Sequence, residues 1–182
     1  MTFRDILESK QIGTLYHFTR GRNLIKILNG SEKLNPFDLI SWNNVISCTR
    51  NACMSSEIFQ NDFSIKDGYI VRISLDGTKM SNKFKILPIA GYSNNDTDIF
   101  NHKKNDKRIH RSTGEFEEVI LKSKINIKEY IKQIDIYNYD SKSQELYETV
   151  KEICEKNNIT LNLVRKFNIV ENVDSEEFFG IL

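Results

Sequence analysis

Cysteine is scarce in this sequence, and the few that occur are not spaced for the usual cysteine-based sites. Cys48, Cys53 and Cys154 are the three cysteines among 182 residues, and no CxxC spacing accompanies them. An odd number without metal-ligand spacing argues against a disulfide framework and against a structural zinc. We therefore expect reduced thiols, no metal and a cytoplasmic location.

The sequence also lacks an excess of either charge and a long apolar run. Lys and Arg number 26 and Asp and Glu 25, which gives a net charge of +1. No chain-wide attraction to nucleic acid or membrane follows from that balance, so any such contact has to be local. No run approaches the ~20 apolar residues of a membrane span, and residues 1–10 are too charged for a secretion signal. We expect no membrane partner.

Proline and glycine are too sparse to mark a linker. The chain has two prolines and eight glycines, and no internal repeat or Pro/Gly/Ser-rich stretch divides it. Its length and its 39% hydrophobic residues suffice for one sizeable core and not for two full domains. The sequence therefore predicts a single domain over residues 1–182.

Apolar periodicity predicts an α+β fold. Alternating or apolar runs predict strands at 15–19, 45–50, 69–75, 85–88, 115–121, 131–137, 159–163 and 167–170. Helical spacing predicts a short helix near the N-terminus, helices at 23–28 and 144–155, and one turn at 127–130. Gly30 marks the end of the second helix, and Pro88 confines its strand to an edge or an end. Residues 93–114 are polar enough to predict a long surface loop.

Three carboxylates, Glu115, Glu117 and Glu118, run directly into an apolar strand-like segment. Because side chains alternate along a strand, Glu117 and Glu118 point to opposite faces. At least one carboxylate therefore meets a half-buried sheet surface, which is costly unless the group is solvated or binds something. Both a solvated strand start and a binding carboxylate explain this stretch.

Two earlier residues carry chemistry of the same kind. His17 lies in a predicted strand, where a histidine is either a core residue with a satisfied ring or a ligand contact. Arg50 ends a predicted strand and is either a surface charge or an anion-binding group. The order of the residues, a histidine strand, an arginine at a strand end and then a glutamate strand, is more informative than each residue alone.

This ordered set resembles DarT-type ADP-ribosyltransferases and their phage and bacterial relatives. The segments that carry the resemblance are Tyr16-His17-Phe18-Thr19, Asn23-Leu24, Ile27-Leu28-Asn29-Gly30, Cys48-Thr49-Arg50-Asn51 and Glu118-Val119-Ile120-Leu121, followed by Ile125 and the strand at 130–136. The resemblance extends from Leu15 to Tyr137, and identity is weak between the motifs. Each motif is short, and the specificity lies in their order.

The resemblance implies two small sheets packed at an angle, with an NAD cleft between them and flanking helices. It implies Glu118 and Arg50 as catalytic residues. It implies as NAD-binding residues His17, Phe18, Thr19, Asn23 and Tyr69. The family's glutamate directly precedes a Val-Leu-type run, which favours Glu118, while Glu115 and Glu117 remain alternative carboxylates. The aromatic ring that stacks on nicotinamide is either Tyr69 or Tyr92.

These residue types suit the implied chemistry. Breaking the bond between nicotinamide and ribose develops positive charge on the sugar, which a fixed carboxylate stabilises. The planar fork of arginine binds pyrophosphate oxygens bidentately. The sequence has no Gly-rich phosphate loop of the dinucleotide-binding type, so side chains would hold NAD.

A basic segment precedes the acidic strand. Residues 102–111 contain one Asp and five cations, Lys103, Lys104, Lys107, Arg108 and Arg111. In ADP-ribosyltransferases, the segment that leads into the catalytic glutamate meets the acceptor. A basic segment there suits a nucleic acid backbone, which we favour, or an acidic protein surface. A solvated loop is the other interpretation.

The sequence therefore predicts a toxin-like, NAD-dependent mono-ADP-ribosyltransferase that modifies a nucleic acid or protein acceptor in the cytoplasm of a bacterium or a phage-infected host cell. One alternative is a non-catalytic nucleotide- or partner-binding module on the same fold. A second is an NAD glycohydrolase, and a third is a structural protein in which the motif order is accidental. No antitoxin or other inhibitor partner is predicted from these residues.

Overall fold

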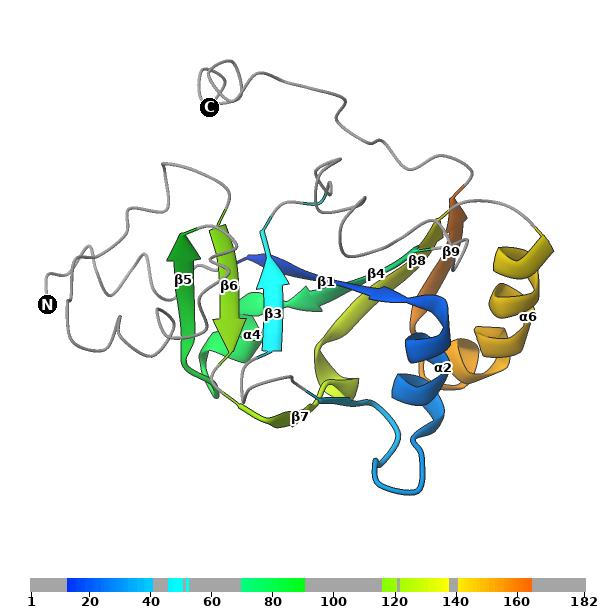
Figure 1. The fold of residues 1–182 in the computed structure, drawn as a ribbon, viewed down its shortest axis with the longest axis horizontal. Helices are drawn as coiled ribbons and strands as arrows, with labels where there is room; N and C mark the ends of the chain where they lie inside the picture. The colour runs from blue at the N-terminus through cyan, green and yellow to red at the C-terminus, as the bar shows by residue number, and fades with distance from the viewer. Residues whose placement is uncertain are drawn as a thin grey trace, which may run out of the picture.

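The computed structural model describes residues 13–40, 46–50, 52, 70–90, 116–120, 122–137 and 141–164, with the backbone alone described for 87–90 and 116–119. The strands are β1 (Thr14–Arg20), β2 (Asp38–Ile40), β3 (Ile46–Thr49), β4 (Ile70–Asp76), β5 (Ile86–Ala90), β6 (Phe116–Ile120), β7 (Lys124–Asn126), β8 (Ile131–Tyr137) and β9 (Thr160–Val164). The helices are α2 (Gly21–Asn29), α4 (Gly77–Ser81), α6 (Ser141–Lys156) and the 3-10 turn η2 (Lys128–Tyr130) (Figure 1).

Most predicted elements are confirmed, with small shifts at their ends. The strands predicted at 15–19, 45–50, 69–75, 85–88, 115–121, 131–137 and 159–163 correspond to β1, β3, β4, β5, β6, β8 and β9. The helices predicted at 23–28 and 144–155 are α2 and α6, and the turn at 127–130 is η2. The predicted N-terminal helix, the loop at 93–114 and the strand at 167–170 lie outside the described residues.

Three observed elements were not predicted. Strands β2 and β7 have three residues each, too few for an alternating pattern to be visible. Helix α4 follows β4 without a loop, although the Asp76-Gly77 pair suggests only a strand end. The Oδ1 atom of Asp76 accepts a hydrogen bond from the backbone N–H of Lys79 at 2.9 Å, which caps the new helix.

Within the described residues, seven strands form one sheet in the order β5-β6-β3-β1-β4-β8-β9, and β2 and β7 form a two-stranded sheet. β1 and β4 pair along their whole length, whereas β1 and β3 join at one residue pair, Tyr16 with Thr49. Figure 1 shows β3, β5 and β6 running across the direction of β1 and β4. The expected pair of small sheets is therefore corrected to two strand groups that remain hydrogen-bonded at this junction. Pro88 was expected to confine its strand to an edge or an end, and β5 is the outer strand on one side of the described sheet.

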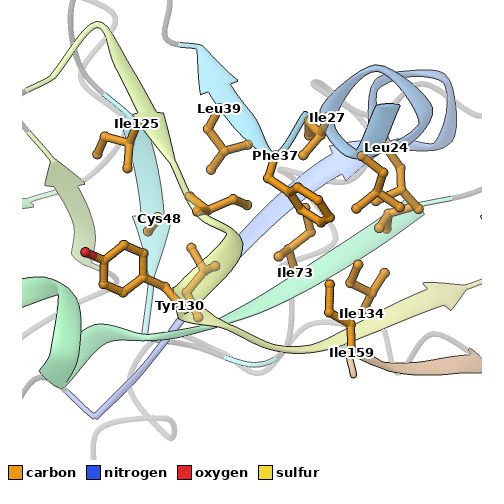
Figure 2. Close-up of a cluster of buried hydrophobic side chains, with 14 of the residues drawn as sticks. Leu24, Ile27, Phe37, Leu39, Cys48, Ile73, Ile125, Tyr130, Ile134 and Ile159 are labelled. Atoms are coloured by element: carbon orange, nitrogen blue, oxygen red, sulfur yellow. The ribbon is translucent and has the colours of Figure 1, made fainter. Parts of the chain in front are cut away.

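One core unites both strand groups with the helices. Helices α2 and α6 stand side by side in Figure 1. They contribute to that core the buried residues Leu24, Ile27, Leu28, Leu146, Val150 and Cys154. Figure 2 shows Leu24 of α2, Ile73 of β4, Ile134 of β8 and Cys48 of β3 in one cluster. Burial of these apolar side chains is the main stabilising term of the fold.

Among the described helices, none combines the length and the apolar content that a membrane crossing requires.

Gly30 ends helix α2 as predicted, and its backbone explains why. Its φ of +77° lies in the left-handed region that disfavours residues with a Cβ atom. A Cβ atom placed there would also lie 2.5 Å from the backbone oxygen of Leu34. The glycine therefore permits the tight return of the chain toward β2.

Candidate functional site

The strand register brings the backbone positions of His17, Arg50 and Glu118 to one junction. Thr49 of β3 pairs with Tyr16 of β1 on one side and with Glu117 of β6 on the other. The neighbouring residue Cys48 pairs with Glu118. If the antiparallel pairing of β1 and β3 is continued by one residue, His17 falls in the row of Cys48 and Glu118. In a regular sheet, the Cα atoms of His17 and Glu118 are then two strand spacings apart, about 10 Å.

Arg50 follows the last residue of β3 and so lies at the same junction. The side chain is half-buried, and its Nε and Nη2 atoms are shielded from solvent. A guanidinium stays charged at any physiological pH. In a partly desolvated position its attraction for an anion is stronger than at an open surface. Arg50 therefore has the charge and the surroundings that suit a phosphate group.

His17 is held in one protonation state by its surroundings. Its Nδ1 atom lies 2.8 Å from the backbone oxygen of Ser47 in β3. A carbonyl oxygen can only accept, so Nδ1 carries the hydrogen and donates it. Burial lowers the pKa of His17 from its ordinary 6.5, against the opposing effect of the bond to Ser47. The ring is therefore neutral near pH 7, and its Nε2 atom can accept a hydrogen bond from a hydroxyl group.

The other predicted NAD-binding residues of this region divide between the two faces of β1. Thr19 is buried, and its Oγ1 atom accepts a hydrogen bond from the Nδ2 atom of Asn23 in α2 at 3.3 Å. Strand alternation places Thr19 on the face of His17 and Phe18 on the opposite face. Phe18 pairs across the strands with Arg72. The structure therefore groups His17, Thr19 and Asn23 and separates Phe18 from them.

Several predicted site residues lie outside the described residues. These are Tyr69, Tyr92, Glu115, Lys103, Lys104, Lys107, Arg108 and Arg111. Glu117 and Glu118 are described through their backbone alone, in consecutive pairs with Thr49 and Cys48. The register therefore keeps both glutamates at the junction, and the preference for Glu118 stays a prediction.

Metal and thiol chemistry find no support in the described part of the chain. No group of three or more His, Cys, Asp or Glu side chains there could hold a metal ion. Cys48 and Cys154 are buried cysteines that do not form a disulfide. Burial raises the pKa of Cys154 to about 11, so it remains an unreactive thiol at neutral pH.

Comparison with known proteins gives a distant structural likeness. No family model matches the chain, and no curated protein matches it. Among solved structures, it is similar to DarTG of Thermosipho africanus in complex with ADP-ribose, at 13% sequence identity and a TM-score of 0.48. The match covers 85% of this chain and 50% of that chain, so this chain spans half the length of the solved protein. Similarity at this level assigns neither a family nor an activity.

Sequence reasoning missed a polar network beside the junction. Arg72 in β4 and Asp135 in β8 face each other across paired strands and form an ion pair at 2.8 Å, in which the carboxylate is buried and the guanidinium is half-buried. Part of the signal was present in the sequence, because Arg72 is the one charged side chain of the predicted strand at 69–75, whereas the strand at 131–137 contains Lys132 as well as Asp135. Opposite charges at such positions suggest a cross-strand pair.

Acid is expected to destabilise the protein through His17. The unfolded chain takes up a proton at a pKa near the ordinary 6.5, whereas the folded state has a lowered pKa. Between the two pKa values the unfolded state binds more protons, so the free energy of unfolding falls as the pH falls, by at most about 1.4 kcal/mol per pH unit for this one group. Above 6.5 the ring is neutral in both states, and the contribution does not change with pH.

His17→Asn provides the comparison for this prediction, because an amide donates to the Ser47 oxygen from nearly the same position and does not titrate. Denaturant unfolding of both proteins at about pH 7.5, 6.5 and 5.5 gives the difference in their free energies of unfolding. We expect the wild type to lose stability relative to the variant over the lower interval. Parallel pH profiles would contradict the assignment of a neutral, half-buried His17.

Proposed function

We propose that this chain is an NAD-dependent mono-ADP-ribosyltransferase that modifies a macromolecular acceptor, nucleic acid in preference to protein. The observation that carries the proposal is the register of β1, β3 and β6. It brings His17, Arg50 and the backbone of Glu118, which come from three distant segments, to one junction. The same three residue types occur in the order of the DarT-like motifs.

In the proposed reaction, the bond between nicotinamide and C1′ of the ribose breaks, and nicotinamide leaves with the bonding electrons. Glu118 accepts a hydrogen bond from the 2′-hydroxyl and stabilises the positive charge on the sugar. A nucleophilic oxygen or nitrogen of the acceptor then bonds to C1′ and releases its proton. The products are nicotinamide, the ADP-ribosylated acceptor and one proton.

His17 and Arg50 orient NAD for this step. The Nε2 atom of His17 accepts a hydrogen bond from a ribose hydroxyl, since its Nδ1–H is already donated to Ser47. Arg50 binds the pyrophosphate with its planar fork. Fixing the sugar and the phosphates places the scissile bond against the carboxylate, which lowers the entropic part of the barrier.

The basic segment 102–111 provides the acceptor side of the proposal. It ends at Arg111, shortly before β6 begins at Phe116, and contains Lys103, Lys104, Lys107, Arg108 and Arg111. Because the chain has a net charge of only +1, this local excess is what would attract a phosphate backbone. Transfer to nucleic acid should therefore weaken steeply as salt is raised.

The test uses NAD labelled in its adenylate phosphate, incubated with single-stranded DNA, duplex DNA, RNA and cell-lysate protein. We expect label on one acceptor class and nicotinamide release in equal amount. Release of free ADP-ribose with no labelled macromolecule would instead select an NAD glycohydrolase. NAD binding without turnover would select a binding module. Neither binding nor turnover with any acceptor would overturn the proposed function.

A further inference from the structure

Arg72 joins three segments of the protein through one guanidinium. Its Nε and Nη2 atoms donate to the Oδ2 atom of Asp135 at 3.1 and 2.8 Å. Its Nη1 atom donates to the backbone oxygen of Ala52 at 2.6 Å. The rings of Tyr16 and Tyr137 lie 5.2 and 5.4 Å from the guanidinium carbon, within the range of cation–π attraction. The side chain is therefore held on several sides at once.

Asp135 is the fixed end of this arrangement. Its side chain is 2% exposed, and its Oδ1 atom accepts hydrogen bonds from Gln133 at 2.6 Å and from Asn162 at 2.8 Å. Donors from β4, β8 and β9 thus meet on one carboxylate. Because every lone-pair direction that faces the protein is used, Asp135 cannot turn without losing charge-assisted bonds. Arg72 is consequently anchored on the rigid part of the sheet.

The Nη1 end of the guanidinium lies beside the junction. Ala52, which receives the Nη1 hydrogen bond, lies two residues after Arg50, and Tyr16 directly precedes His17. Arg72 therefore contacts a residue within two positions of each residue that the proposed function assigns to NAD positioning. Tyr16 is also the residue that pairs with Thr49 where the two strand groups meet.

We propose that Arg72, anchored by Asp135, is a positioning residue that holds Ala52 beside β4 and so sets the place of Arg50 relative to His17. The inference rests on the proposed function, because the role of Arg50 in binding NAD is part of it. Arginine is required, since one lysine nitrogen cannot reach Asp135 and the oxygen of Ala52 together.

The test is Arg72→Lys, assayed on the acceptor that the wild type modifies. We expect the KM for NAD to rise by about tenfold or more, with a smaller change in kcat, because Arg50 binds substrate from a displaced position. Arg22→Lys on the exposed face of α2 is the matched control and should leave both constants unchanged. Hydrogen exchange in peptides that contain residues 50–52 should become faster in Arg72→Lys alone.

A double-mutant cycle separates positioning from general loss of structure. If Arg72 acts through Arg50, Arg72→Lys adds no further rise in KM once Arg50→Lys is present. Equal effects of Arg72→Lys in both backgrounds would overturn the inference, as would an unchanged KM in the single variant. If Arg72→Lys fails to fold, Asn162→Ala, which removes one donor to Asp135 and keeps the guanidinium, should show the same changes at smaller size. A wild type without NAD binding or transfer would instead overturn the proposed function.

Discussion

Glu118→Gln is expected to reduce ADP-ribosyl transfer by about 10²-fold or more while NAD binding changes little. The amide has nearly the shape of the carboxylate but no charge, so it loses the stabilisation of the developing sugar cation and keeps most ground-state contacts. The measurement is the initial rate of labelled ADP-ribose transfer at saturating NAD, together with the dissociation constant of NAD.

Glu117→Gln is the matched control, since Glu117 sits one register pair away, opposite Thr49. It should retain most of the transfer rate. A larger loss in Glu117→Gln than in Glu118→Gln would assign the reaction to the neighbouring carboxylate. Equal, near-wild-type rates in both variants would remove the basis for a catalytic glutamate on β6.

Asp135→Asn is expected to lower the free energy of unfolding by about 3–5 kcal/mol, the usual consequence of removing one partner of a buried ion pair. The substitution leaves the Arg72 charge without its counter-ion. The NH₂ group of the new amide also faces hydrogen-bond donors, either those of Arg72 or those of Gln133 and Asn162. In the wild type, all of these donate to the carboxylate. The measurement is denaturant unfolding of both proteins at neutral pH.

An exposed ion pair provides the control for this stability prediction. Glu129 lies 3.5 Å from both Lys79 and Lys83, and its side chain is 52% exposed. Glu129→Gln should leave the unfolding midpoint nearly unchanged, because solvent screens such pairs. A shift in Asp135→Asn no larger than this control would mean that the Arg72 network does not stabilise the fold.

Local patterns were sufficient for the long elements of this protein. β4 and β8 have apolar residues on each buried face, and α6 repeats Leu146, Val150 and Cys154 at helical spacing. β2 and β7 could not be found in the same way, because three-residue strands exist only through their pairing with each other. Helix α4 was missed because an aspartate such as Asp76 is equally typical of a turn and of a helix cap.

The same distinction between local features and long-range pairing applies to the candidate site. His17 and Arg50 were selectable from the sequence, since a histidine inside a strand and an arginine at a strand end are local features. The state of the His17 ring was not, because its donor bond goes to Ser47, which lies 30 residues away. The Arg72–Asp135 pair spans 63 residues, and only strand pairing brings its members together.

By itself, the sequence determined the kinds of residue available for chemistry, the succession of most strands and helices, the helix end at Gly30 and the restriction of the Pro88 strand to an edge or an end. Each depends on interactions within a few residues, where periodicity and backbone preference act directly. The tertiary structure alone decided that the two strand groups meet at Tyr16 and Thr49, that His17 keeps Nε2 as an acceptor, and that Arg72 ties Ala52 to Asp135. These facts depend on which distant strands become neighbours and in which register, and that choice is made by burial of a common core.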